Sequence, residues 1–151
     1  MPVGFLVRDF MATTVTSLPH TASLFDAAMM LRRTGYRHFP IVDGERLVGI
    51  ITDRDVSRLA PSLLEKITQE EYNAILQNTP LELIMTQNPL TTTPDTPILD
   101  AVAVLHHKKV GCLPVVEGER LTGIITVTDM LGLLHRLLGG NVPSEFELEG
   151  A

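Results

Sequence analysis

The chain has 151 residues with a formal net charge of −6, and 44% of its residues are hydrophobic while only 5% are aromatic. This length and composition predict one domain, or two small lobes, around an aliphatic core. The acidic balance argues against general nucleic-acid or anionic-membrane binding, because both need a basic field. Glu145, Glu147 and Glu149 carry half of the net charge, so the folded body is expected to be closer to neutral.

Cysteine usage and the N-terminus indicate the compartment. Cys112 is the only cysteine, so no intrachain disulfide can form and a reducing cytoplasm is the expected location. Charge appears at Arg8 and Asp9, too early for the apolar core of a signal peptide. No apolar run approaches the roughly 18 residues of a membrane helix. We therefore expect a cytoplasmic protein that does not bind membranes.

The first half of the chain predicts a helix followed by a hairpin and a second helix. Ser23 and Asp26 form a capping-box pattern, and Gly35 is expected to end the helix that follows. Pro40 fits the start of a strand, because proline has no backbone N–H and that position does not need to donate a hydrogen bond to the neighbouring strand. The expected elements are an apolar segment at 5–11 docked ahead of the first repeat, an extended Thr-rich arm at 13–19, a helix at 24–35, strands at 39–42 and 47–51, and a helix at 52–60.

The second half repeats this pattern after a linker. Residues 61–80 are polar with a helical interior, and Leu63, Leu64 and Ile67 are expected to pack on the body. Thr96 is predicted to cap the next helix with Pro97 at its first position. The other expected elements are an apolar segment at 81–85, an arm at 90–94, a helix with the buried stripe Ile98, Ala101, Val102 and Leu105, strands at 113–116 and 121–125, a helix at 126–138 and an acidic, disordered tail at 139–151.

Two junctions of the form Gly-Ile-Ile-Thr-x-x-Asp organise the chain. They occupy 49–55 and 123–129, and the spacing of 74 residues also relates Met11 to Met85 and Pro40 to Pro114. Each copy reads β-α-β-β-α, which predicts a duplicated α/β (α+β) fold with two equivalent clefts. A copy of about 60 residues makes a marginal core alone. We therefore expect two repeats, 7–60 and 81–138, joined by the linker at 61–80 and packed by a pseudo-twofold.

These features together resemble a tandem pair of cystathionine-β-synthase (CBS) domains, or Bateman module, over nearly all of residues 7–138. The resemblance rests on Asp9-Phe10-Met11 with Leu83-Ile84-Met85, on the hairpins that begin Phe39-Pro40 and Leu113-Pro114, and on the two junctions. It implies two α/β lobes, a disc-like dimer of two modules, adenosine compounds bound between the lobes, and regulation of a partner protein. With no catalytic domain beside the pair, the chain resembles the stand-alone bacterial members.

The resemblance assigns ligand contacts to the junctions. It places Thr52 and Thr126 against phosphate or ribose, and Asp55 and Asp129 on the ribose hydroxyls. A carboxylate can accept both hydrogen bonds of a vicinal diol, and a helix N-terminus favours an anion. The alternative is that Thr-x-x-Asp only caps the helix, and the two roles are compatible.

Other candidate contacts adjoin the junctions. Basic residues before the strand reach phosphate in nucleotide-binding relatives, and exposed side chains without a ligand are the alternative. Copy one offers Arg37, His38, Asp53 and Arg54, where copy two has Gly111, Cys112, Val127 and Thr128. The candidate set also includes the strand residues Phe39, Pro40, Leu113 and Pro114. The arm residues Thr14, Val15 and Thr16, with Thr91, Thr92 and Thr93, lie where the family supplies backbone groups to adenine, and plain β-propensity is the alternative.

Patterns for other chemistry are weak or missing. His106 and His107 are adjacent in a helix and point apart, so a solvated helix end is favoured over a metal site. Cys112 lies in a strand and reads as a small core residue. No Ser-His-Asp set, Walker loop or Gly-x-Gly-x-x-Gly fingerprint is present. We therefore expect neither catalysis, nor a catalytic cofactor, nor a metal.

The sequence thus predicts a regulatory sensor of an adenine nucleotide (AMP, ADP or ATP). The alternatives are an interaction scaffold whose CBS fold no longer binds ligand and, with less support, a small enzyme. The expected partners are the nucleotide, an unknown regulated protein and a second copy of the chain. The homodimer is predicted because the last helix is apolar on more than one side, and the alternative is that the linker at 61–80 covers the second side. The residues are Met130, Leu133, Leu134 and Leu137, widened by Leu131 and Leu138.

Overall fold

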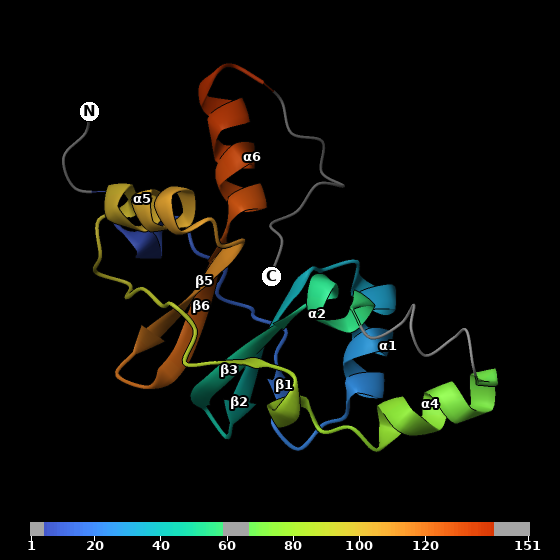
Figure 1. Cartoon of the computed structure of the whole chain (residues 1–151). Coiled ribbons are helices and arrows are strands. Elements are labelled where there is room, and N and C mark those ends of the chain that lie inside the picture. The colour runs from blue at the N-terminus through green and yellow to red at the C-terminus, as the bar shows by residue number, and fades with distance from the viewer. Residues whose placement is uncertain (1–4, 59–66, 141–151) are drawn as a thin grey trace. The chain divides into compact units, whose positions relative to one another are not determined.

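The computed structural model describes residues 5–58 and 67–140, and the chain divides into two compact units (Figure 1). We call Ser17–Pro89 the N unit, and Met1–Thr16 with Leu90–Ala151 the C unit. The C unit therefore contains both the beginning of the chain and its second half. Each unit is described by itself below.

The N unit is a small sheet covered by helices. Strand β1 (Leu18–Pro19) runs parallel to β2 (His38–Asp43), which forms an antiparallel hairpin with β3 (Arg46–Thr52), and β4 (Thr86–Gln87) pairs antiparallel with β3. The remaining elements are α1 (Leu24–Thr34), α2 (Asp53–Ser57), α4 (Gln69–Gln77) and the 3-10 turn η2 (Leu81–Leu83). The predicted capping box at Ser23 and Asp26 is present, and Gly35 ends α1 with a φ of 73°.

The C unit repeats this architecture. Its hairpin consists of β5 (Cys112–Glu117) and β6 (Arg120–Thr126), and its helices are α5 (Ile98–Lys108) and α6 (Val127–Leu137), with the 3-10 turn η1 (Val7–Asp9). Thr92 bridges to Val115 in parallel, as β1 does to β2, and Ala12 bridges to Ile124 in antiparallel, as β4 does to β3. The predicted α+β class is confirmed.

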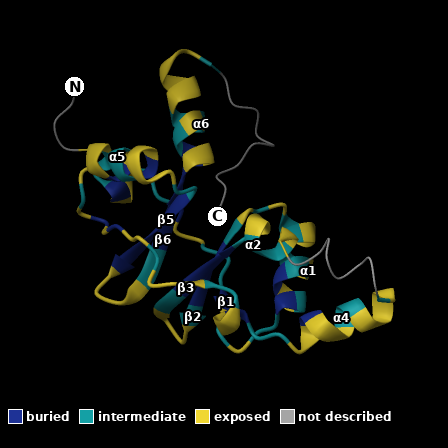
Figure 2. Ribbon diagram, viewed as in Figure 1, coloured by how far each residue is buried: buried dark blue, intermediate teal, exposed yellow. Residues whose placement is uncertain are grey.

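Each unit has its own aliphatic core (Figure 2). In the N unit Phe39 is the largest fully buried side chain, and the fully buried partners around it include Leu24, Ile41, Ile51 and Leu81. In the C unit, Leu113, Val115 and Ile125 of the hairpin pack with Ala101 and Leu105 of α5 and with Val7. The burial of these side chains between the helices and the sheet stabilises the packing of the two layers in each unit.

The leading segment of each repeat completes the unit built by the other repeat. Residues 5–16 lead into the first repeat but belong to the C unit, where Val7 is fully buried and the Met11 Sδ lies against Gly123. Residues 81–89 begin the second repeat but belong to the N unit, where Met85 lies against Gly49. The compact units therefore divide the chain differently from the sequence repeats 7–60 and 81–138, and the segment 5–11 packs in the unit that holds the second hairpin.

Several local predictions were wrong. Helix α5 begins at Ile98, and the Thr96 hydroxyl pairs with the Thr93 hydroxyl at 2.7 Å instead of capping α5. Pro97 supplies the extended residue before the helix, which displaces Thr96 from the cap position. Val102 was expected in the buried stripe but is 37% exposed, because α5 turns Ala101 and Leu105 to the core with Ile98 and Val104 packed beside them.

Other predictions concern the linker and the tail. The linker interior is helical as expected, and Leu76 of α4 enters the core of the N unit. Leu63, Leu64 and the acidic residues 141–151 lie outside the described residues. Over 5–58 and 67–140, no helix has both the length and the apolar character needed to cross a membrane.

Candidate functional site

The N-unit junction is a closed capping box at the start of α2. Thr52 ends β3 opposite His38, and its Oγ1 accepts the Asp55 N–H at 3.2 Å. The Asp55 Oδ2 accepts the Thr52 N–H at 2.9 Å in return. The Asp53 N–H donates to the Arg37 carbonyl at 3.0 Å, which fixes the residue before β2 against the first turn of α2. Thr52, Asp55, Arg37 and His38 are thus brought to one end of the unit.

The C-unit junction repeats this arrangement with a more buried carboxylate. Thr126 ends β6 opposite Cys112, its Oγ1 accepts the Asp129 N–H at 3.0 Å, and the Val127 N–H donates to the Gly111 carbonyl at 2.9 Å. Asp129 is only 4% exposed, whereas Asp55 is half-buried. Burial strengthens any hydrogen bond that this carboxylate makes.

Asp129 also lines a pocket within the C unit. The pocket has a volume of about 430 Å³, and its wall comes from one face of α6 and from the leading segment that follows η1. Its lining residues are Asp9, Phe10, Met11, Asp129, Met130, Leu133 and Arg136. The sequence analysis did not assign Asp9, Phe10, Met11 or Arg136 to a site. The helical spacing of Asp129, Leu133 and Arg136 could have indicated their shared face.

Comparison with known families decides which fold this is. The family model described as the CBS domain matches the chain twice, over residues 7–62 and 81–136. The chain belongs to the CBS domain family. Both CBS matches contain one leading segment, one hairpin and one Thr-x-x-Asp junction, which are the features that the sequence analysis paired at a spacing of 74 residues.

Similar proteins include free-standing CBS proteins and larger enzymes. A CBS domain-containing protein of Dictyostelium discoideum is 31% identical over 135 residues, which are 88% of this chain and 93% of that protein. An A-adding tRNA nucleotidyltransferase of Geobacter sulfurreducens is 32% identical over 142 residues, but the match covers 93% of this chain and only 14% of the enzyme. The shared part of that enzyme is thus a small fraction of its length.

Solved CBS structures share the fold. A Vibrio cholerae protein attributed to acetoin utilization (AcuB) has a TM-score of 0.75 at 28% identity, covering 97% of this chain and all of the other. CBSX2 in complex with AMP has a TM-score of 0.74 at 25% identity, covering 89% and 99%. The CBS domain pair of protein MJ0100, in complex with 5′-methylthioadenosine and S-adenosyl-L-methionine, has a TM-score of 0.69 at 28% identity, covering 86% and 99%.

Two of the candidate residues have side chains that face the CBS cores, since Phe39 and Leu113 are fully buried in the hydrophobic clusters. Pro40 and Pro114 follow them in β2 and β5 and are also buried, but successive strand residues point to opposite faces of the sheet. The Phe39 and Leu113 side chains stabilise the hairpins, so only their backbone atoms are available to a ligand. Asp53, Arg54 and Thr128 are exposed in the first turns of α2 and α6.

The structure sets the register of the two arms. Leu18 lies opposite Ile41 and Thr92 opposite Val115, and both pairs are related by 74 residues. The counterpart of Thr92 is therefore Leu18, while Thr14, Val15 and Thr16 come earlier in the arm, and their contact with adenine stays a prediction. β-propensity identifies extended residues but does not fix which of them pair.

The backbone of Thr92 is already engaged in the sheet. Its N–H donates to the Pro114 carbonyl at 3.0 Å, and its carbonyl accepts the Val116 N–H at 2.9 Å. The N–H therefore cannot contact adenine without breaking the pairing with β5, while the carbonyl, which has two lone pairs, can accept one further hydrogen bond. In the other copy, Thr14 is exposed and Val15 and Thr16 are half-buried in a stretch of the C unit without regular structure.

The described residues give little support to other chemistry. His106 and His107 were expected to point apart, but their ring centroids lie 5.0 Å from each other at a tilted angle of 57° on the exposed last turn of α5. Across the described ranges, no group of three or more His, Cys, Asp or Glu side chains is placed to hold a metal ion. Cys112 is 6% exposed at the start of β5, in agreement with its expected place in the core.

Proposed function

We propose that this CBS protein is a regulatory sensor of adenosine nucleotides without catalytic activity of its own. The observation that carries the proposal is the Thr–Asp pair at each strand–helix junction, with the buried Asp129 lining a pocket. In this proposal Asp55 and Asp129 accept the ribose hydroxyls, while Thr52 and Thr126 cap the helices and present their backbone to the ligand. The AMP complex of CBSX2 and the adenosyl complexes of MJ0100 support this ligand class.

A ligand screen tests the proposal against its alternatives. AMP, ADP, ATP, 5′-methylthioadenosine, S-adenosylmethionine and NADH are added separately, and thermal unfolding is followed. A ligand that binds only the native state stabilises it by about 2.7 kcal/mol at 100 times its Kd. We expect a raised Tm with at least one adenosine compound. An unchanged Tm with every compound, together with no heat of binding in calorimetry, would favour the interaction scaffold. Turnover of the nucleotide would favour an enzyme.

We further infer that the two junctions are unequal in their preference for phosphate. Arg37, His38 and Arg54 adjoin the N-unit junction, where the C unit has Gly111, Cys112 and Thr128. Charge-assisted contacts to phosphate are the strong ones, so the N unit should favour phosphorylated ligands. The C unit keeps the ribose-binding pair with fewer cations. It is expected to bind such ligands more weakly or to take a less charged adenosine compound.

Titration with ATP at two salt concentrations measures this difference. Arg37→Ala should weaken the tighter site by up to about fivefold, and the loss should shrink as salt rises, because an exposed charge pair contributes about 0.2–1 kcal/mol and is screened. Arg46→Ala is the matched control, since Arg46 is also exposed but lies at the hairpin turn with Asp43. Two identical sites indifferent to Arg37 would contradict the prediction.

We also propose that the chain forms a homodimer through α6. Leu131, Leu134 and Leu137 are 60%, 50% and 75% exposed, and Leu138 just beyond the helix is 79% exposed. A helix that exposes this much apolar surface is expected to bury it against another chain. Light scattering at micromolar concentration should give the dimer mass, and Leu134→Glu with Leu138→Glu should reduce it to the monomer. Leu99→Glu, at a 64% exposed position of α5, is the control. A monomeric wild-type mass would count against this interface.

A further inference from the structure

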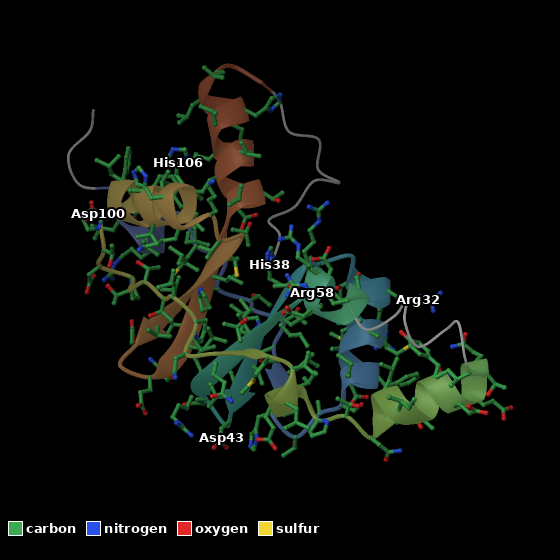
Figure 3. All side chains as sticks on the ribbon, viewed as in Figure 1. Arg32, His38, Asp43, Arg58, Asp100 and His106 are labelled. Carbon is green, nitrogen blue, oxygen red and sulfur yellow. The ribbon has the colours of Figure 1, made fainter. Side chains whose placement is uncertain are left out.

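Exposed arginines gather at one end of the N unit. Helix α1 ends, β2 begins and α2 starts at this end, since His38 at the start of β2 pairs with Thr52 at the end of β3 and α1 packs against α2. Figure 3 shows Arg32, His38 and Arg58 here, with Asp43 at the opposite end of β2. We call this surface the arginine end. It comprises Arg32 and Arg33 in the last turn of α1, Arg37 before β2, Arg54 in α2 and Arg58 directly after α2.

Four arginines of the arginine end, Arg32, Arg33, Arg54 and Arg58, are not neutralised by ion pairs within the described residues. The ion pairs of His20 with Asp43 and Glu82, and of Arg46 with Asp43, lie away from this end. Over the described ranges, no ion pair joins Arg32, Arg33, Arg54 or Arg58 to a carboxylate. The acidic residues of α2 are engaged by backbone N–H groups, at 2.9 Å for Asp53 with Arg54 and 2.9 Å for Asp55 with Thr52.

The fold does not require these arginines. The C unit has the same architecture, and the positions 74 residues further on are His106, His107, Gly111, Thr128 and Gly132. Solubility alone does not explain why five of these positions are arginine in the N unit while none of the matching positions in the C unit is arginine. Arginine differs from lysine in its planar fork, which matches carboxylate or phosphate oxygens in pairs.

We propose that the arginine end docks a carboxylate-rich segment of a partner protein, and that a phosphorylated ligand at the Thr52–Asp55 junction weakens this docking. A protein partner fits better than nucleic acid, because the chain as a whole carries a charge of −6 and would repel a long polyanion. The docking rests on the arginines alone. Only the coupling to ligand rests on the proposed function.

The coupling has a simple electrostatic cause. Arg54 lies in the first turn of α2, and Arg37 is hydrogen-bonded through its carbonyl to that turn. A phosphate held beside the junction neutralises the same cations that attract the acidic segment. Linkage then requires the acidic segment to weaken ligand binding by the same factor by which the ligand weakens docking.

A labelled deca-glutamate peptide serves as the probe for docking. Its binding to the full chain is followed by fluorescence anisotropy at low and at physiological salt. We expect Arg32→Gln with Arg33→Gln to weaken binding about two- to tenfold, as two exposed charge contacts are lost. Lys108→Gln with Lys109→Gln is the matched control, since both lysines are exposed at the end of α5 in the C unit. Equal losses in the two variants, or no binding at low salt, would overturn the proposal.

Further measurements separate the possible occupants. A ten-nucleotide thymidine oligomer that binds more tightly than the peptide would assign the surface to nucleic acid and overturn the proposal. If probe binding becomes stronger after Glu145, Glu147 and Glu149 are all changed to Gln, but not after Asp100→Asn, Glu117→Gln and Glu119→Gln are combined, the surface would be assigned to the chain's own acidic residues. That result would also overturn the proposal. If ATP binds in calorimetry but leaves probe binding unchanged, the coupling is overturned. If ATP does not bind, the proposed function fails while the docking result stands.

Discussion

Asp129→Ala is expected to weaken binding of an adenosine ligand in the C unit by roughly tenfold to a hundredfold. The reason is the loss of hydrogen bonds to a charged group, which contribute about 1.5–3 kcal/mol. Asp129 is 4% exposed and lines the pocket beside α6, so water replaces these bonds poorly. Asp55→Ala should act in the same way on the N unit. Calorimetry measures the affinity, and thermal unfolding of the same variants measures stability.

Asp26→Ala is the control that separates ligand binding from helix capping. Asp26 closes a capping box with Ser23 at 3.2 and 3.0 Å, and Asp55 closes one with Thr52 at 3.2 and 2.9 Å. Loss of either cap should cost about 1 kcal/mol of stability. Asp26 lies at the start of α1, away from the junction, so its loss should leave ligand affinity intact. If Asp55→Ala and Asp129→Ala behave like Asp26→Ala, both aspartates are caps and the ribose role is wrong.

Gly49→Ala should release the second leading segment from the N unit and lower its free energy of unfolding by about 1–3 kcal/mol. A Cβ at this position would lie 2.9 Å from the Thr86 carbonyl oxygen and would also meet the Met85 Sδ. Because a backbone oxygen is involved, trimming Met85 to Ala should not rescue the variant. Urea unfolding gives the change in free energy, and hydrogen exchange at Thr86 reports whether β4 leaves β3.

The C unit offers the paired variant, and α6 offers the control. Gly123→Ala would place a Cβ 2.9 Å from the Ala12 carbonyl oxygen and 2.8 Å from the Met11 Sδ, so the same loss is expected there. Gly132→Ala meets no atom within 4 Å and lies inside α6, where alanine is favoured over glycine by about 0.5–1 kcal/mol. Unchanged stability in Gly49→Ala and Gly123→Ala would show that the leading segments adjust at no cost.

The sequence predicted the features that depend on neighbouring residues. Local hydrogen bonds and turn geometry determine the capping box at Ser23, the end of α1 at Gly35 and the two hairpins. These interactions join residues that are close in the sequence, so the sequence alone indicates them. The junction roles of Thr52 and Thr126 as caps were predicted for the same reason. The prediction that Thr96 caps α5 was wrong because both Thr96 and Pro97 suit the start of a helix. The Thr93 hydroxyl also forms a hydrogen bond with the Thr96 hydroxyl.

Features that depend on distant partners could not be predicted in this way. Val7 and Leu81 are aliphatic residues at the same spacing in two similar segments, and either would suit either hairpin. In the structure Met11 of the first segment packs against Gly123 and Met85 of the second against Gly49, and because both glycines accept a close methionine, local sequence does not distinguish this arrangement from the reverse. The pocket beside Asp129 was missed for the same reason, because Asp9 and Phe10 reach it from the other end of the chain.

Because each leading segment packs in the unit built by the other repeat, the two units can fold only in a certain order during protein synthesis. Ala12 pairs with Ile124, so the first segment to leave the ribosome waits until 112 further residues have been added. At about 5–20 residues per second this is a wait of roughly 6–22 s. During that time Val7, Phe10 and Met11 have no native partners and offer an apolar surface to chaperones. The N unit, whose last contributing segment ends at Pro89, can be completed first and remains folded while the C unit is still being made.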